Sequence, residues 1–264
     1  MIRYFRLYLF FVRFSFSRAL EFRADFTFRI FMDLIYYTVN LLFYKIVFLN
    51  MGDAKLAGWR EDQIMVFVAG YLMVDAVVMT IFSNNFWWLP ESINRGDLDY
   101  YLTRPVSSLF FLSLRDFAAN SFMNLLMTFG IFVWALDNYQ GPVTAGGVAL
   151  FVALLGVGVL LYYCLRLLTI IPIFWMHSGR GLEQLFWTTT RLMERPDRIF
   201  TGWVRRILIS ILPFGLMASF PARIFLEGLD WWLLLHLLGT AAAFFCAVVF
   251  FWRLGLRAYS SASS

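Results

Sequence analysis

The sequence predicts an all-α integral membrane protein with six transmembrane helices in a single transmembrane domain over residues 1–264. The chain is 61% hydrophobic and 15% charged, whereas soluble domains average roughly 45–50% and 25%. Its mean hydropathy is +0.71, and one water-soluble core cannot bury that much apolar surface. Six stretches also reach or approach the roughly 20 residues that cross a hydrocarbon core of about 30 Å.

The first 29 residues are expected to form an amphipathic helix on the cytoplasmic surface of the membrane. On a helical wheel of about 100° per residue, polar side chains gather on one face while phenylalanine and leucine fill most of the rest. The polar face holds Arg3, Arg6, Arg13, Ser17, Arg18, Glu21 and Asp25. A helix with this pattern lies in the membrane interface.

The six spans are expected within a bundle over residues 30–254, at 30–49, 64–82, 117–136, 148–171, 204–220 and 233–252. Pro213 interrupts the fifth stretch and Pro221 ends it, so we expect a broken or re-entrant element before the sixth span. The apolar stripe of residues 182–193 is expected to lie flat on the inner leaflet. Residues 255–264 are expected to form a cytoplasmic tail.

The positions of arginine and lysine predict the orientation. Seventeen of them fall at the two termini and in segments 83–116 and 173–206, and four fall in the opposite loops. Loops rich in these residues stay in the cytoplasm. Both termini are therefore expected on the cytoplasmic side.

The sequence lacks the residues of common catalytic sites. No glycine-rich phosphate loop with its lysine is present, so the chain is not expected to bind ATP. His177 and His236 are far apart, and Cys164 and Cys246 lie in apolar runs without further ligands at metal-binding spacing. We predict no catalytic residue, no metal site and no nucleic-acid partner; membrane lipid is the partner that the composition implies.

Two polar features inside the spans are candidates for a translocation path. Asp75 lies in the middle of the second span, where an unpaired carboxylate costs about 2.5–3.5 kcal/mol, so it should face protein or water. Either Asp75 takes part in transport, or its carboxyl group is neutral or paired with another side chain and has a structural role. A polar stripe also starts the third span, and it either lines a hydrated path or packs on another helix; with Ser113, it contains Asp116, Asn120, Asn124 and Thr128.

Residues 89–105, between the second and third spans, are expected to form two short cytoplasmic helices. Pro90 suits the first turn of a helix, and Gly96 suits its end. Leu98, Tyr101 and Leu102 form a second short helical face, which Pro105 stops. The charged residues around Gly96 then stand between the two helices.

This segment resembles a signature of the integral membrane subunits of type-two ABC exporters. The matching residues are Arg95-Gly96-Asp97-Leu98-Asp99 with Leu102 and Arg104-Pro105. Further fragments look like the same six-span permease family: residues 20–26, Pro213, Pro221-Ala222, Phe251-Trp252-Arg253 and residues 256–262. The resemblance covers essentially the whole chain.

The resemblance implies a permease subunit of the bacterial plasma (inner) membrane that has no motor of its own. Two permeases, more often related than identical, would sit on a dimer of cytoplasmic ABC ATPases, which bind the ATP and magnesium. The segment after the second span would be the coupling helix that enters a groove on the ATPase. The residues that carry this docking role are Ile93, Arg95, Gly96, Asp97, Leu98, Tyr101 and Arg104.

Two other functions remain open from the sequence. The first is an autonomous ion-coupled carrier or channel in which Asp75 is the titrating group. The absence of inverted repeats and of further buried charges in the sequence weighs against it. A membrane-embedded enzyme is the third reading, and the shortage of histidine and clustered carboxylates weighs against it. Flux through the purified chain alone distinguishes a carrier from an ATP-driven exporter.

Overall fold

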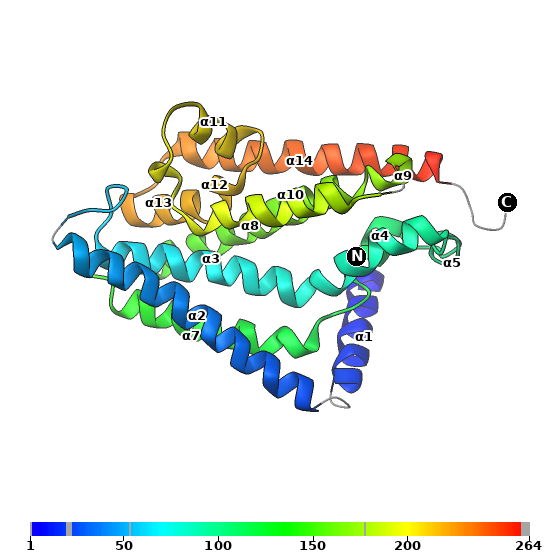
Figure 1. Cartoon of the computed structure of the whole chain (residues 1–264), viewed down its shortest axis with the longest axis horizontal. Coiled ribbons are helices and arrows are strands. Elements are labelled where there is room, and N and C mark those ends of the chain that lie inside the picture. The colour runs from blue at the N-terminus through cyan, green and yellow to red at the C-terminus, as the bar shows by residue number, and fades with distance from the viewer. Residues whose placement is uncertain (1, 20–22, 53, 177, 260–264) are drawn as a thin grey trace.

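The computed structural model describes residues 2–19, 23–52, 54–176 and 178–259. In these residues five helical segments are long and apolar enough to cross a membrane, and they run along the length of the molecule (Figure 1). They are α2 (Arg23–Met51), α3 (Glu61–Ile81), η1 with α7 (Ala119–Ser121 and Phe122–Asp137), α8 with α9 (Ala145–Ile170 and Ile173–Met176) and α14 (Trp231–Ala258). Five predicted spans are therefore found close to their expected positions, and residues 260–264 of the predicted tail lie outside the described residues.

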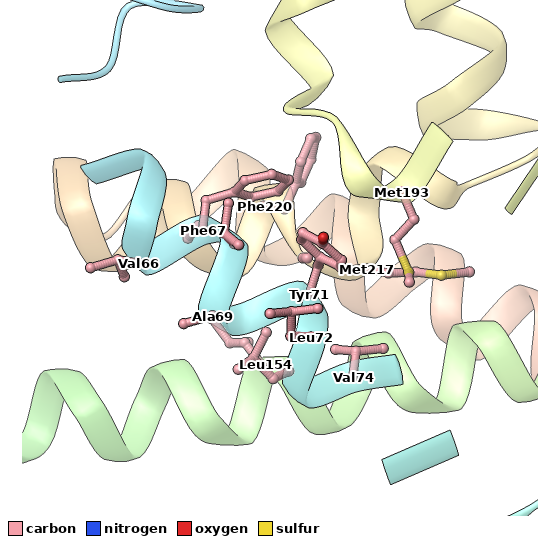
Figure 2. Packing of buried hydrophobic residues seen from close by; sticks show 14 of the residues in the cluster. Val66, Phe67, Ala69, Tyr71, Leu72, Val74, Leu154, Met193, Met217 and Phe220 are labelled. Atoms are coloured by element: carbon pink, nitrogen blue, oxygen red, sulfur yellow. The ribbon is translucent and has the colours of Figure 1, made fainter. Parts of the chain in front are cut away.

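Helix α3 is the centre of the bundle. Of its apolar stretch 72% is buried, against 11% for α2, because α7, α8, α2 and α13 all pack around it. Figure 2 shows this packing, with α3 side chains meeting residues of α8, η2, α12 and α13; they include Val66, Phe67, Ala69, Tyr71, Leu72, Val74, Leu154, Met193, Met217 and Phe220. An apolar helix surrounded on all sides belongs to the protein interior.

The N-terminal region forms two helices. Helix α1 (Ile2–Ala19) stands across the direction of α3, and α2 begins at Arg23 (Figure 1). The expectation of one helix through residues 1–29 is wrong in its extent, because α1 and α2 run in different directions and α2 continues into the first span. The aromatic rings of Phe11 and Phe16 pack on Phe111 and Phe117. Location of α1 on a membrane surface stays a prediction.

Three short helices connect α3 to η1 at the end of the bundle near α1. They are α4 (Ser83–Arg95), α5 (Asp99–Leu102) and α6 (Ser108–Leu114). We call this the α4–α5 end, and the opposite end, which holds the loop between α2 and α3, the Trp59 end. The two ends lie at the right and the left of Figure 1.

Residues 180–199 run from the α4–α5 end back to the Trp59 end. Helix α10 (Arg180–Thr190) starts where Glu183 pairs with Arg166 of α8, and η2 (Arg191–Glu194) and η3 (Asp197–Ile199) follow. At the far end Arg198 pairs with Glu227, whose carboxylate also accepts a hydrogen bond from Trp59. The expectation that residues 182–193 lie flat on a leaflet does not fit this course along the bundle, in which Phe186 and Met193 are buried while Leu185 is exposed.

The fifth predicted span, residues 204–220, is not a continuous helix. It is divided among α11 (Gly202–Ser210), α12 (Phe214–Met217) and the start of α13 (Ser219–Glu227). Nine residues of α11 extend only about 14 Å at 1.5 Å per residue, which is too short to span a bilayer. Pro213 breaks the chain between α11 and α12 because it has no N–H to continue the helical hydrogen bonds. The expected broken element before α14 is present, and the expected span is not.

The backbones of α12 and α8 are in close contact at Gly158, which has no side chain to separate them. A Cβ atom at this position would lie 2.1 Å from the carbonyl oxygen of Met217. Only glycine therefore permits this contact. The broken segment before α14 is thus fixed against the central part of α8.

Candidate functional site

The segment between α3 and α6 contains the first group of candidate residues. Helix α4 ends at Gly96, which is left-handed with φ 76°. The N–H of Asp97 donates to the carbonyl of Ser92 at 3.1 Å, a typical glycine-terminated helix end. The predicted break at Gly96 is therefore present, but α4 begins at Ser83, so Pro90 lies inside it and not in its first turn.

The inner face of this segment is part of the bundle. Ile93 and Leu98 are 6% and 0% exposed and lie in a hydrophobic cluster with residues of α4, α6, α8 and α14; these include Phe86, Leu89, Leu112, Cys164, Leu167 and Trp252. Tyr101 is half-buried and packs against Trp88 and Phe111. Side chains in these positions hold the segment in place, so the expectation that Ile93 and Leu98 themselves contact a partner does not fit their burial.

The outer face of the segment carries exposed charges of both signs. Arg95, Asp97 and Arg104 are all exposed. Arg95 forms an ion pair with Glu91 one turn earlier. The guanidinium of Arg104 lies 4.5 Å from the centre of the Tyr100 ring and donates a hydrogen bond to its hydroxyl. These side chains are free to meet a partner that presents complementary charges.

Contacts from both ends of the chain fix the position of the segment. The N–H of Leu98 donates to the hydroxyl of Tyr259 at 3.1 Å, just after α14. Burial and the nearby Asp99 carboxylate raise the pKa of Tyr259 above its ordinary value, so this phenol stays protonated. The N–H of Ser107 donates to the Tyr4 hydroxyl of α1 at 3.3 Å. The α4–α5 segment is therefore connected to α1 and to the residue after α14.

An ion pair between α8 and α10 lies next to α4. Arg166, on α8, is 2% exposed, and its guanidinium lies 2.7 Å from the Glu183 carboxylate and stacks near Phe186. A pocket of about 440 Å³ separates this ion pair from Glu91 and Arg95 of α4. Arg166 lies within the predicted span 148–171, and this ion pair gives its charge a partner. It places a charged contact of residues 180–199 beside the α4–α5 segment.

Asp75 lies on α3 among groups from three other elements. Its carboxylate is half-buried and within electrostatic range of Asp33 on α2 and Glu194 in η2. It forms no hydrogen bond or ion pair with any residue that the structure describes. Four tyrosines surround it electrostatically: Tyr36 and Tyr37 of α2, Tyr71 of α3 and Tyr162 of α8. We call these seven residues the Asp75 cluster.

Hydrogen bonds hold the elements of this cluster together. The Tyr71 hydroxyl donates to the side-chain oxygen of Asn40 on α2. The Tyr44 hydroxyl, also on α2, donates to the carbonyl of Glu194 at 2.5 Å. Positions 33, 37, 40 and 44 follow helical spacing, so a polar face on α2 was visible in the sequence. Its neighbours on η2 and α8 depend on tertiary structure.

The polar stripe expected at the third span does not form one helical face. The chain leaves the helix between α6 and η1, so Ser113 and Asp116 are separated from Asn124 and Thr128. The Ser113 hydroxyl is 2.9 Å from that of Tyr163, and the backbone of Asp116 exchanges two hydrogen bonds with the Asn85 side chain. These groups join helices to one another, which is one of the two roles that the sequence left open.

The structure does not bring the stripe together with Asp75. Thr128 is 0% exposed, and its hydroxyl lies 3.9 Å from the sulfur of Met73 on α3. Met73 and Asp75 are two residues apart and therefore point to nearly opposite sides of the helix. Asn124 is also buried, at 5% exposure, and Asn120 lies in η1. Of the expected path residues, only Asp75 faces the cluster on α2 and η2.

Comparison with known proteins decides the family. A sequence model described as ABC-2 family transporter protein matches residues 34–263. The chain belongs to this family. No curated protein and no solved structure matches it.

Membership gives the broad role of the chain. ABC-2 membrane proteins are permease subunits and not ATPases, and they work with an ATPase partner in an ABC transporter. The resemblance expected from residues 95–105 is thereby confirmed at the level of the family. With its apolar helices, the chain is a multi-pass membrane protein of the ABC transporter class.

Proposed function

We propose that the chain is the permease subunit of an ABC exporter in a bacterial inner membrane, with both termini cytoplasmic. It forms a substrate path with a second permease, related but not identical. A dimer of cytoplasmic ATPases docks on α4 and α5. ATP and magnesium bind in those partner subunits.

The exposed charges of the α4–α5 segment are the observation that carries this proposal. They stand on a short helical platform whose inner face is buried in the bundle and whose flanks are tied to α1 and α14. Such a platform moves as a unit with the helices behind it. ATPase closure can then shift the balance between two packed states of the permease.

We place the substrate path along α2, α3 and residues 180–199. Helix α2 exposes most of its length, including Phe31, Val39 and Ile46, and this apolar face suits the second permease or lipid. The Asp75 cluster lies behind it. Crossing by residues 180–199 would supply the sixth passage and keep both termini on one side. The buried groups Asn124 and Thr128 are assigned to helix packing.

Copurification tests the proposal. The chain is isolated in mild detergent from its native membranes, partners are identified by mass spectrometry, and ATP hydrolysis of the eluate is measured. We expect a stoichiometric ATPase subunit and a second permease. A chain that elutes alone and conducts flux in proteoliposomes without ATP would favour the autonomous carrier and contradict the proposal.

Replacement of Asp75 by asparagine is expected to lower the ATPase activity of the reconstituted complex about tenfold. The change removes a titratable carboxylate from the middle of a span, where an unpaired charge costs about 2.5–3.5 kcal/mol, and it preserves side-chain shape. Subunit stoichiometry should stay constant. Asp137→Asn, in an exposed position at the end of α7, is the matched control. Unchanged activity would show that Asp75 is not part of the substrate path. Loss of the complex would show that Asp75 has a structural role.

A further inference from the structure

Four arginines gather at the Trp59 end of the bundle, around η3, α11 and α13. They are Arg198, Arg205, Arg206 and Arg223. Two acidic residues, Asp197 and Glu227, form ion pairs with three of them. Arginine is disfavoured in membrane-protein loops that face away from the cytoplasm. In the proposed topology this end faces outward, so the prediction that the whole segment 173–206 is cytoplasmic does not hold for Arg198, Arg205 and Arg206. A local group of four arginines with two acidic partners on that side calls for a function.

Two of these arginines are held in fixed positions by ion pairs. Arg205 donates two hydrogen bonds to one oxygen of Asp197, at 3.0 and 2.7 Å, and Asp197 is 0% exposed. The other oxygen of Asp197 accepts a 2.6 Å hydrogen bond from Ser219. Arg198 makes a bidentate pair with Glu227 at 2.6 and 2.7 Å. Both guanidinium groups are therefore preorganised, with further N–H groups still free.

Arg206 has no such partner. Its side chain is exposed, and it makes no hydrogen bond or ion pair with any residue that the structure describes. Together with the two fixed arginines it lines a pocket of about 490 Å³, which also includes Phe200, Thr201 and Gly202 at the start of α11. This volume is within the roughly 300–1,000 Å³ of small-ligand sites. Three arginine residues thus line a space large enough for a charged headgroup.

The surroundings of the pocket are apolar and exposed. Trp203 is 72% exposed, and Ile199 and Ile211 are 40% and 65% exposed. Tryptophan beside exposed aliphatic side chains is typical of the headgroup level of a bilayer. A ligand at this level would have acyl chains that lie along the isoleucines. These neighbours favour a lipid over a soluble anion.

We propose that this pocket binds the phosphate of an anionic phospholipid headgroup. Planar guanidinium groups match phosphate oxygens in a bidentate manner, and Thr201 and Gly202 at the start of α11 line the same pocket. The lipid would join η3 to α11 and stabilise the broken segment before α14. Binding itself does not depend on the proposed transport function; only the assignment to the outer leaflet does.

Lipid binding to the purified full-length chain tests the proposal. Native mass spectrometry would measure the affinity for phosphatidylglycerol, for phosphatidylcholine, for diacylglycerol, which lacks the phosphate, and for soluble glycerol phosphate. Arg206→Gln is expected to weaken phosphatidylglycerol binding about fivefold, the effect of one basic residue near a membrane surface. Arg206→Lys should lose less. Lys55→Gln removes one positive charge from an exposed position at the same end and should leave the affinity unchanged.

Three results would overturn the proposal. Arg206→Gln could bind phosphatidylglycerol as well as the original chain does. Lys55→Gln could weaken binding equally, which would indicate a diffuse field in place of a site. Glycerol phosphate could displace the lipid at similar concentration, which would make a soluble phosphate compound the ligand. Because no ATPase takes part, these results are independent of whether the chain exports anything.

Discussion

Replacement of Arg95 by glutamate is expected to weaken the association of the permease with its ATPase at least about tenfold, because like charges juxtaposed at an interface cost several kcal/mol. The fold should survive. Arg95 is exposed and pairs only with Glu91, and such surface pairs contribute about 0–1 kcal/mol. The measurement is the amount of ATPase that copurifies, together with the ATP hydrolysis of the complex.

Two further variants make this result specific. Asp97→Arg reverses a neighbouring charge on the same exposed face and should have the same effect. Lys55→Glu changes the charge by the same amount at the Trp59 end and should leave the complex intact. If the full amount of ATPase copurified with both Arg95→Glu and Asp97→Arg, these two charges would not belong to the docking surface.

Replacement of Gly158 by alanine is expected to lower the thermal midpoint of the purified chain by about 2–12 °C. The new methyl group would meet the backbone carbonyl of Met217 at 2.1 Å. Backbone cannot rotate away as a side chain can, so α12 must move off α8, and overpacking of this kind costs about 1–3 kcal/mol. At roughly 2–4 °C per kcal/mol for a chain of this size, the shift is measurable.

Gly156→Ala is the matched control on the same helix. A Cβ atom there would meet nothing within 4 Å, and alanine is favoured over glycine in a helix by about 1 kcal/mol. Its thermal midpoint should stay constant or rise. Equal losses in the two variants would mean that α8 tolerates neither change for a reason unrelated to α12.

Hydropathy predicted most of the helices, because five segments are both apolar and long. It failed at residues 180–227. The stretch 180–199 carries Glu183, Arg191 and Asp197, so no window of it looks like a span. It nevertheless runs the length of the bundle, where Arg166 of α8 pairs with Glu183 and Arg205 of α11 pairs with Asp197. The stretch 204–220 is apolar, but Pro213 breaks it. The course of residues 180–199 depends on tertiary contacts that a local pattern does not contain, whereas Pro213 is a local signal that hydropathy does not weigh.

The candidate site was predicted in part for the same reason. Gly96 and the residues around it gave a local signal for the end of α4. Whether Ile93 and Leu98 faced a partner or the bundle depended on α6, α8 and α14, which are distant in sequence. Asp75 was identified by its charge in an apolar span. Its neighbours Tyr162 and Glu194 come from elements about 90 and 120 residues away, a distance that only the folded structure bridges.

Site-specific photo-cross-linking in the assembled transporter tests the docking of the ATPase on α4 and α5 most directly. A photoreactive phenylalanine analogue would replace Tyr100, which is 63% exposed on α5, or Trp231, which is 66% exposed at the start of α14 and the Trp59 end. We predict a covalent product with the ATPase subunit from position 100 and none from position 231. The absence of that product at position 100, or its formation from position 231 alone, would contradict the account.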